Sequence, residues 1–274
     1  MLTFVKFGGS VITDKQGHEA PDAPLIARLA AEVAAARHIQ PELQLILSHG
    51  SGSFGHVYAA RYGIHKGLPA SSNWIGFART ADAAARLNRI VVAALLACDV
   101  PTLTLQPSAS ALAQNGILQH WETATLTHAL TQRLVPLVYG DVAFDSAQGS
   151  AIISTEQLLA YLCQQPALQP QRIVLVGEAA VYTADPRREP QAAPIAQINV
   201  SNIEAVLHGS GGSHGVDVTG GMHNKITLMW SLVQRLPQLE VVLIGPQPGL
   251  LTQALSGHVP SFGTIIRRGT LLTL

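Results

Sequence analysis

The sequence has 274 residues, of which 47% are hydrophobic and 12% are charged, so it can bury a large apolar core. Lys plus Arg and Asp plus Glu number 17 each, which excludes the basic surface of a protein that binds nucleic acid or an anionic membrane and favours a small-molecule ligand. Cys98 and Cys163 lack metal-binding and redox spacing, no signal-peptide pattern opens the chain, and the longest apolar run, Ile90 to Cys98, is too short to span a bilayer. We therefore expect a cytoplasmic protein.

Strand-like and helix-like runs alternate along the chain, which predicts an α/β fold with a largely parallel sheet covered by helices. The expected strands are short, apolar and mostly β-branched: Thr3 to Phe7, Gln44 to Ser48, Thr102 to Leu105, Val135 to Tyr139, Arg172 to Val176 and Glu240 to Ile244. The expected helices run from Asp22 to about His38, and over Val57 to Tyr62, Ser71 to Cys98, Thr155 to Cys163, Ser201 to Leu207 and Met222 to Arg235.

The Pro- and Gln-rich stretch Gln164 to Gln171 is the best candidate for a boundary between lobes. We expect an N-terminal lobe over 1–165 and a C-terminal lobe over 166–274, joined by one continuous sheet in a single structural domain. Glycine-rich turns lie on both sides of the boundary, so the two lobes are expected to share a ligand site beyond the carboxyl ends of the strands.

The first glycine-rich segment, Lys6-Phe7-Gly8-Gly9-Ser10, ends the first expected strand, and Lys15 follows shortly after. Adjacent glycines let backbone N–H groups approach a phosphate, and a lysine adds a point charge. The same residues also fit a tight turn after an edge strand.

The second segment, His49-Gly50-Ser51-Gly52-Ser53-Phe54-Gly55-His56, joins an expected strand to a helix. Such a turn directs free N–H groups and the positive end of a helix dipole at an anion. It matches neither the P-loop nor the dinucleotide-binding pattern, and His56 is placed to contact the same anion.

Two further segments follow the boundary. Tyr182-Thr183-Ala184-Asp185-Pro186 fits either a plain turn or the border of a nucleotide site. Asp217 to Lys225 opens the last long helix with Thr219 and adjacent glycines, another anion-binding helix start. The chain has four lysines against thirteen arginines, and Lys6, Lys15 and Lys225 all fall in or beside these segments, which indicates phosphate binding rather than a general need for surface charge.

Together these motifs resemble the amino-acid kinase superfamily, in the same order and across nearly the whole chain. The carrying motifs are Lys-x-Gly-Gly-Ser, Tyr-Thr-x-Asp-Pro and Thr-Gly-Gly-Met-x-x-Lys, and the loop ending in Gly-Ser-Phe-Gly-His is similar to the isopentenyl phosphate kinase branch. Tyr139-Gly140-Asp141-Val142 also resembles that branch. The resemblance implies a three-layer αβα sandwich, a homodimer, and phosphoryl transfer from ATP, with Mg²⁺ carried by the nucleotide, to isopentenyl phosphate.

The resemblance also implies a role for each motif residue. The ATP phosphates and nucleotide are assigned to Lys6, Gly8, Gly9, Ser10, Asp185, Thr219, Gly220, Met222 and Lys225. The substrate phosphate is assigned to Gly50, Ser51, Gly52, Gly55, His56 and Gly140. Catalysis is assigned to His56, Lys6, Lys15 and Lys225, and no spacing indicates a dedicated protein metal site.

The chain departs from the family pattern at three places. Ser51 replaces the middle glycine of a Gly-Gly-Gly run, Ile153-Ser154-Thr155-Glu156 stands where Ser-Gly-Asp-Asp is usual, and Gly177-Glu178-Ala179-Ala180 stands where Asp-Val-Asp-Gly is common. The last two lie on the nucleotide side and bear on ATP affinity and turnover.

Two alternative functions remain open at this stage. A kinase of a fosfomycin-like phosphonate or another small phosphorylated alcohol would keep every phosphate-binding residue, and only an apolar pocket beyond His56 separates it from a prenyl phosphate kinase. Trp74, Ile75 and Phe77 are candidates for that pocket, or for the core. A nucleotide-binding regulator without catalysis is the second alternative.

Overall fold

The computed structural model describes residues 1–14, 17–69, 72–177, 180–184, 189, 191–210, 221–258, 260 and 262–269. Two sheets are present. An eight-stranded main sheet has the order β10 (Gln197–Ile198), β12 (Thr264–Ile266), β11 (Glu240–Ile244), β9 (Arg172–Val176), β1 (Leu2–Phe7), β2 (Gln44–His49), β6 (Val135–Tyr139), β3 (Thr102–Thr104). A four-stranded sheet has the order β5 (Ile117–His120), β4 (Leu112–Gln114), β7 (Asp141–Asp145), β8 (Gly149–Ile153).

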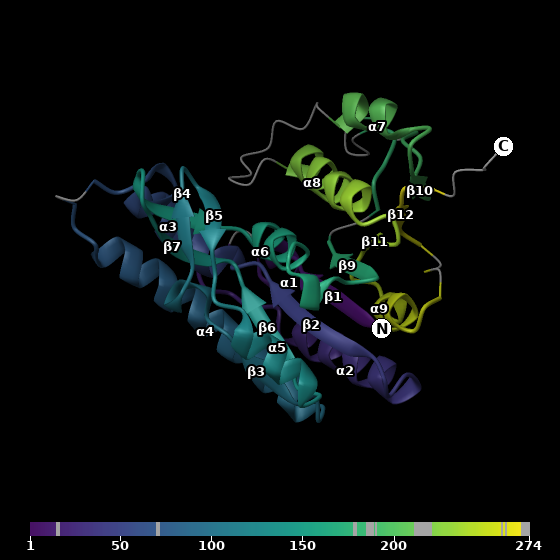
Figure 1. Cartoon of the computed structure of the whole chain (residues 1–274), viewed down its shortest axis with the longest axis horizontal. Coiled ribbons are helices and arrows are strands. Elements are labelled where there is room, and N and C mark those ends of the chain that lie inside the picture. Colours follow the sequence, from purple (N-terminus) through teal and green to yellow (C-terminus); the bar gives the residue numbers. More distant parts are fainter. Residues whose placement is uncertain are drawn as a thin grey trace.

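Helices cover both faces of the main sheet (Figure 1). The described helices are α1 (Gly9–Ile12), α2 (Ala23–Ile39), α3 (Gly52–Tyr62), α4 (Ile75–Ala97), α5 (Ala124–Thr131), α6 (Thr155–Leu162), α7 (Ile203–Ser210), α8 (Gly221–Arg235) and α9 (Leu250–Leu255). One buried cluster packs α2, α4 and α9 on one face, and another packs α5, α6, α7 and α8 on the opposite face. The fold is therefore the expected three-layer αβα sandwich.

Successive side chains along each strand point to opposite faces of the main sheet and so contribute to two separate cores. On β1, Val5 and Phe7 belong to the cluster with α2 and α4, while Phe4 belongs to the cluster with α6 and α8. All three side chains are at most 1% exposed. A strand buried on both faces has apolar residues at consecutive positions, as Phe4 and Val5 are here, which is why the strand was predicted from the sequence.

The first strand is not an edge strand, so the alternative interpretation of Lys6 to Ser10 as a tight turn after an edge strand is wrong. In the main sheet β1 pairs in parallel with β2 on one side and with β9 on the other. The main sheet thereby crosses the expected lobe boundary, which falls at the 3-10 turn Pro166–Leu168 between α6 and β9. The binding roles assigned to the two lobes stay a prediction.

Several element boundaries differ from expectation. Helix α3 begins at Gly52, so the glycine-rich segment forms its first turns instead of a loop before Val57. Helix α4 begins at Ile75, later than the expected Ser71. The four-stranded sheet was not predicted: β7 follows β6 after the single residue Gly140, and the chain bends there out of the main sheet.

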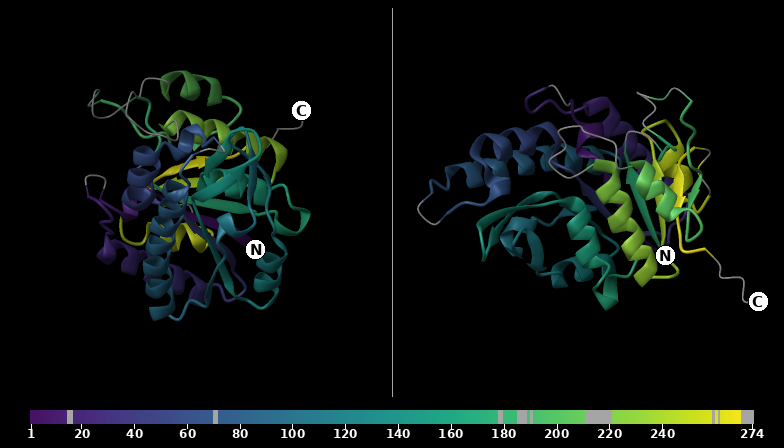
Figure 2. Two further views of the ribbon diagram at one scale, coloured as in Figure 1. Left: turned by 90° about the vertical axis from the view of Figure 1, so that its left-hand side faces the viewer. Right: turned by 90° about the horizontal axis from the view of Figure 1, so that it is seen from above.

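The four-stranded sheet and the first turns of α4 lie at one end of the molecule (Figure 2, right). Among the described residues, no helix is long and apolar enough to cross a membrane.

Candidate active site

A row of glycines lies along the carboxyl edge of the main sheet. Five adjacent parallel strands are each followed directly by a glycine: Gly245 after β11, Gly177 after β9, Gly8 after β1, Gly50 after β2 and Gly140 after β6. The backbone ladder continues through them, with Gly8 N donating to Val176 O at 2.8 Å and Gly50 N to Phe7 O at 3.0 Å. This edge therefore presents backbone rather than side chains, as close approach to a phosphate requires.

The turns after β1 and β2 pack backbone against backbone. A Cβ added to Gly9 would lie 2.5 Å from the nitrogen of Gly52, and a Cβ added to Gly50 would lie 2.9 Å from the nitrogen of Gly9. Gly52 also has a φ of +48°, which disfavours any residue with a side chain. The two motifs predicted separately from the sequence are thus parts of one surface.

Thr13 links the two turns through its buried hydroxyl. The hydroxyl donates to Gly9 O at 2.7 Å and accepts from Ser53 N at 3.0 Å. Within the described residues, no hydrogen bond uses the N–H groups of Ser51 or Gly52 at the start of α3. These groups are therefore available to an anion at the positive end of the helix dipole.

Ser51, the departure from the usual glycine, occupies the N-cap position of α3 without making a side-chain capping bond. Its Oγ would lie 2.4 Å from a Cβ on residue 55, which explains why Gly55 follows it one turn later. The hydroxyl adds a polar group to the same helix start.

Lys6 forms an ion pair with Glu156. Glu156 is one of the residues at which this sequence departs from the family pattern. The two residues come from β1 and α6, and their side chains are 12% and 15% exposed. Burial by itself would raise the pKa of Glu156, but the charge of Lys6, its hydrogen bond and the charge of Lys225 together hold that pKa below the usual value. Lys6, Glu156 and Lys225 therefore form one electrostatic group spanning β1, α6 and α8.

Thr155 fixes the neighbouring turn after β6. Its buried hydroxyl donates to the carbonyl oxygen of His49 at 2.9 Å, and the same carbonyl accepts the N–H of Gly140 at 3.0 Å. Gly140 is itself buried, so it supports the turn after β2 from beneath. Thr155 and Glu156 thus connect the start of α6 to both turns.

His56 lies in α3, one turn past Gly52, and is exposed. Beyond it, an aromatic cluster joins α4 to β7: the ring centroids of Phe77 and Phe144 are 4.9 Å apart, and those of Trp74 and Phe77 are 5.4 Å apart. Tyr62, at the end of α3, packs like Trp74 and Phe77 against the buried side chains Ile64, Leu68 and Val142. Ile75 is 46% exposed and is not among the residues of this cluster.

Several predicted site residues lie outside the described residues, namely Lys15, Asp185, Thr219 and Gly220. Ser10 is exposed and Met222 is partly buried in the first turn of α8. The contacts of Thr13, Thr155 and Glu156 were not predicted, because hydroxyl and carboxylate side chains outside a glycine motif carry no local signal for a site. The one indication in the sequence was that Thr155 and Glu156 depart from the usual family pattern at this place.

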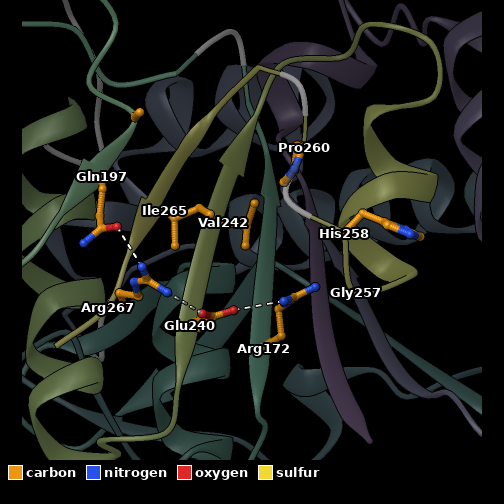
Figure 3. Close-up of a pocket in the computed structure, with 10 residues that line it drawn as sticks. Arg172, Gln197, Glu240, Val242, Gly257, His258, Pro260, Ile265 and Arg267 are labelled. Atoms are coloured by element: carbon orange, nitrogen blue, oxygen red, sulfur yellow. Dashed lines mark hydrogen bonds and ion pairs between the residues drawn. The ribbon is translucent and has the colours of Figure 1, made fainter. Parts of the chain in front are cut away.

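A separate pocket of about 340 Å³ lies at the opposite edge of the main sheet (Figure 3). Glu240, the first residue of β11, is 2.9 Å from Arg172 of β9 and 3.5 Å from Arg267, which follows β12. Glu240 is thus paired with both arginines, and its ion pair with Arg172 connects the amino ends of β9 and β11. We therefore assign this pocket a structural role and place the candidate active site at the glycine edge.

Comparison with known proteins agrees with this arrangement. A sequence model of the amino acid kinase family matches residues 1–244. The isopentenyl phosphate kinase of Methanothermobacter thermautotrophicus is 33% identical over 266 residues, covering 94% of this chain and 96% of that protein. That of Haloferax volcanii is 32% identical over 268 residues, covering 97% and 98%.

A solved structure described as isopentenyl phosphate kinase superimposes with a TM-score of 0.81 at 31% identity, covering 97% of this chain and 100% of that one. Because the family model spans most of the sequence and the similarity extends over whole chains, the chain belongs to the amino acid kinase family.

Proposed function

We propose that this protein phosphorylates isopentenyl phosphate with ATP to give isopentenyl diphosphate for isoprenoid biosynthesis. The observation that carries the proposal is the backbone contact of Gly9 with Gly50 and Gly52, which joins two phosphate-binding turns into one site. Transfer from ATP to an anionic acceptor requires two anion sites side by side, and the backbone N–H groups at the start of a helix suit a phosphate. The whole-chain similarity to isopentenyl phosphate kinases supports the same substrate.

The nucleotide is assigned to the side of the site formed by β1, α6 and α8. In the proposal Lys6 and Lys225 neutralise the β- and γ-phosphates, and Glu156 holds the two ammonium groups in place between turnovers. The remaining nucleotide contacts are those assigned from the family resemblance: Gly8, Gly9, Ser10, Lys15, Asp185, Thr219, Gly220 and Met222. Mg²⁺ arrives bound to ATP as part of the substrate.

The acceptor phosphate is assigned to the start of α3. The N–H groups of Ser51 and Gly52 bind its oxygens, and His56 donates a further hydrogen bond, with Gly55 and Gly140 keeping side chains away. An acceptor oxygen attacks the γ-phosphorus of ATP, the bond from that phosphorus to the β,γ-bridging oxygen breaks, and ADP leaves. Phosphoryl transfer of this kind depends on positioning and charge neutralisation, so no covalent enzyme intermediate is needed.

The aromatic cluster of Trp74, Phe77 and Phe144 favours a prenyl tail over a polar acceptor. His56 and Tyr62 are separated by about 9 Å along α3, at 1.5 Å per residue. Tyr62, Trp74 and Phe77 all pack against the same small buried group of Ile64, Leu68 and Val142. A short branched alkyl chain attached to a phosphate at the start of α3 matches that separation. A phosphonate antibiotic would leave the apolar surface without a partner.

The test is an assay of ADP release with isopentenyl phosphate, dimethylallyl phosphate, fosfomycin and acetylglutamate. The proposal expects the highest kcat/KM with isopentenyl phosphate. Equal or higher activity with acetylglutamate or fosfomycin contradicts the substrate assignment, and ATP binding without turnover of any acceptor favours the regulator. A homodimer and a cytoplasmic location stay predictions from the resemblance, to be checked by light scattering and cell fractionation.

A further inference from the structure

His49, the last residue of β2, is fully buried beneath the turn that begins α3. Its Nδ1 atom is 3.0 Å from the carbonyl oxygen of Gly50, and its Nε2 atom is 3.1 Å from the amide nitrogen of Asn88 on α4. The amide oxygen of Asn88 accepts a 2.9 Å hydrogen bond from the hydroxyl of Thr104, at the end of β3. The imidazole is stacked on Tyr139, with ring centroids 5.5 Å apart and an angle of 8° between the planes.

These hydrogen bonds form a series that ends at the carbonyl oxygen of Gly50, and this oxygen determines the direction of each of them. The carbonyl oxygen of Gly50 can only accept, so Nδ1 of His49 carries the proton. Burial lowers the pKa of His49 to about 4, against the opposing effect of its hydrogen bond to Gly50, so the ring is neutral near pH 7 and Nε2 is an acceptor. Asn88 must then present its NH₂ group to His49 and its oxygen to Thr104.

These hydrogen bonds restrain the orientation of the peptide group that joins Gly50 to Ser51. The described residues contain no cis peptide bond, so the Gly50 carbonyl and the Ser51 N–H point in opposite directions. Gly50 has no side chain to restrict its φ and ψ angles, and the hydrogen bond to His49 is the one made by its carbonyl oxygen among the described residues. A carbonyl held toward His49 turns the Ser51 N–H away from the core, and this N–H has no hydrogen-bond acceptor among the described residues.

We propose that His49 is a positioning residue: supported by Asn88 and Thr104, it fixes the Gly50–Ser51 peptide so that the Ser51 N–H is already directed at the acceptor phosphate. The inference rests on the proposed function for the identity of that phosphate compound. A preset donor binds an anion without the cost of reorienting a peptide, and it stays aligned as the charge is redistributed during transfer.

Thr104 offers the mildest test, because it touches neither the turn nor a substrate. Thr104→Val removes the hydroxyl and keeps the shape, whereas Thr104→Ser keeps the hydroxyl. We expect Thr104→Val to raise the KM for isopentenyl phosphate roughly three- to tenfold, as the loss of one hydrogen bond predicts, with the KM for ATP unchanged. Thr104→Ser should remain near the wild type.

The matched control is Thr102→Val on the same strand, since the Thr102 hydroxyl donates only to the carbonyl of Val100 at 3.1 Å. If Thr104→Val and Thr102→Val have the same KM for the acceptor, the proposal is overturned. A parallel rise in both KM values in Thr104→Val also contradicts it, because a general loss of structure would act on both substrates.

Substitutions at His49 provide the rescue test. His49→Asn places an amide nitrogen close to the position of Nδ1 and retains a donor to Gly50, while His49→Phe keeps a ring on Tyr139 without a donor. The Asn variant should retain at least tenfold more kcat/KM than the Phe variant. Equal activity of two folded variants contradicts the proposal, and if His49→Phe does not fold, the Thr104 series decides.

A spectroscopic measurement separates this inference from the proposed function. In uniformly ¹⁵N-labelled protein, His49 should be neutral and protonated at Nδ1 at pH 7, and titration with inorganic phosphate should shift the Ser51 amide resonance. Thr104→Val should weaken that phosphate response three- to tenfold. A ring protonated at Nε2, or an unchanged response in Thr104→Val, overturns the inference even if isopentenyl phosphate is a substrate. Conversely, a ring protonated at Nδ1 and a weakened response in Thr104→Val can both be observed in an enzyme that prefers another phosphorylated acceptor.

Discussion

Replacing Glu156 by glutamine tests the electrostatic group at the nucleotide side of the site. The substitution keeps the size and an oxygen acceptor for Lys6 but removes the negative charge between Lys6 and Lys225. Removing one partner of a buried ion pair costs about 3 to 5 kcal/mol, and an ion pair at about 4 Å in an effective dielectric constant of 20 gives a similar figure. With side chains 12% and 15% exposed, this pair is near the buried limit.

Because the amide oxygen of glutamine still accepts a hydrogen bond, we expect the lower value, about 3 kcal/mol, which lowers Tm by roughly 6 to 12 °C. The pKa of Glu156 is depressed in the folded state, so its stabilisation is present above the usual pKa of 4.5 and is lost as the pH falls through the folded value. The Tm difference between wild type and Glu156→Gln should therefore be largest at neutral pH and should shrink below about pH 4.5.

The kinetic effect should separate orientation from charge. Without Glu156 the site is more positive, so the KM for ATP should stay the same or fall, while kcat should drop roughly 10- to 100-fold because Lys6 is no longer held in position. Glu42→Gln is the control, since Glu42 pairs with Arg133 on the surface, where the side chains are 80% and 69% exposed, and such pairs contribute little. Turnover near the wild-type rate with a raised KM for ATP would refute the reasoning.

Further substitutions test the remaining assignments. Lys6→Ala and Lys225→Ala should each lower kcat by about 10²- to 10³-fold through loss of transition-state charge neutralisation, with near-normal turnover in either variant contradicting its role. His56→Ala should nearly abolish transfer while ATP, followed by calorimetry, still binds, and His56→Gln should retain more activity; a fully active His56→Ala protein removes the main reason for the prenyl phosphate assignment. Gly9→Ala should lower Tm strongly because its Cβ would lie 2.5 Å from a backbone nitrogen of the facing turn, whereas Gly177→Ala, at a glycine with open space around it, should leave Tm nearly unchanged.

The sequence by itself determined the fold class and the location of the glycine-rich turns. Strands such as Val135–Tyr139 and Arg172–Val176 were predicted at their observed limits, because a strand buried on both faces is a continuous apolar run and the glycine after it marks its end. The glycines were also readable as a functional signal, since a phosphate can approach the backbone only where no Cβ intervenes. Both properties are local, and local sequence encodes them.

Elements whose form depends on their neighbours were missed. Nothing local in Asp141–Asp145 distinguishes a strand of a second sheet from an extension of Val135–Tyr139, because the distinction lies in its pairing with β8 and β4. The start of α3 at Gly52 was missed for a similar reason. Glycine disfavours helix locally, and the link through Thr13 between the two turns overrides that preference.

The chemistry of the site was decided by tertiary structure. Lys6 and Glu156 are separated by 150 positions in the chain, and their pairing exists only because β1 and α6 meet at the carboxyl edge of the main sheet. In the same way, the hydrogen bonds from Thr104 through Asn88 to His49 join β3, α4 and β2. A motif shows which residues can bind phosphate. Which charges compensate one another, and which peptide groups are fixed in direction, depends on distances of a few ångströms between segments that the sequence does not place together.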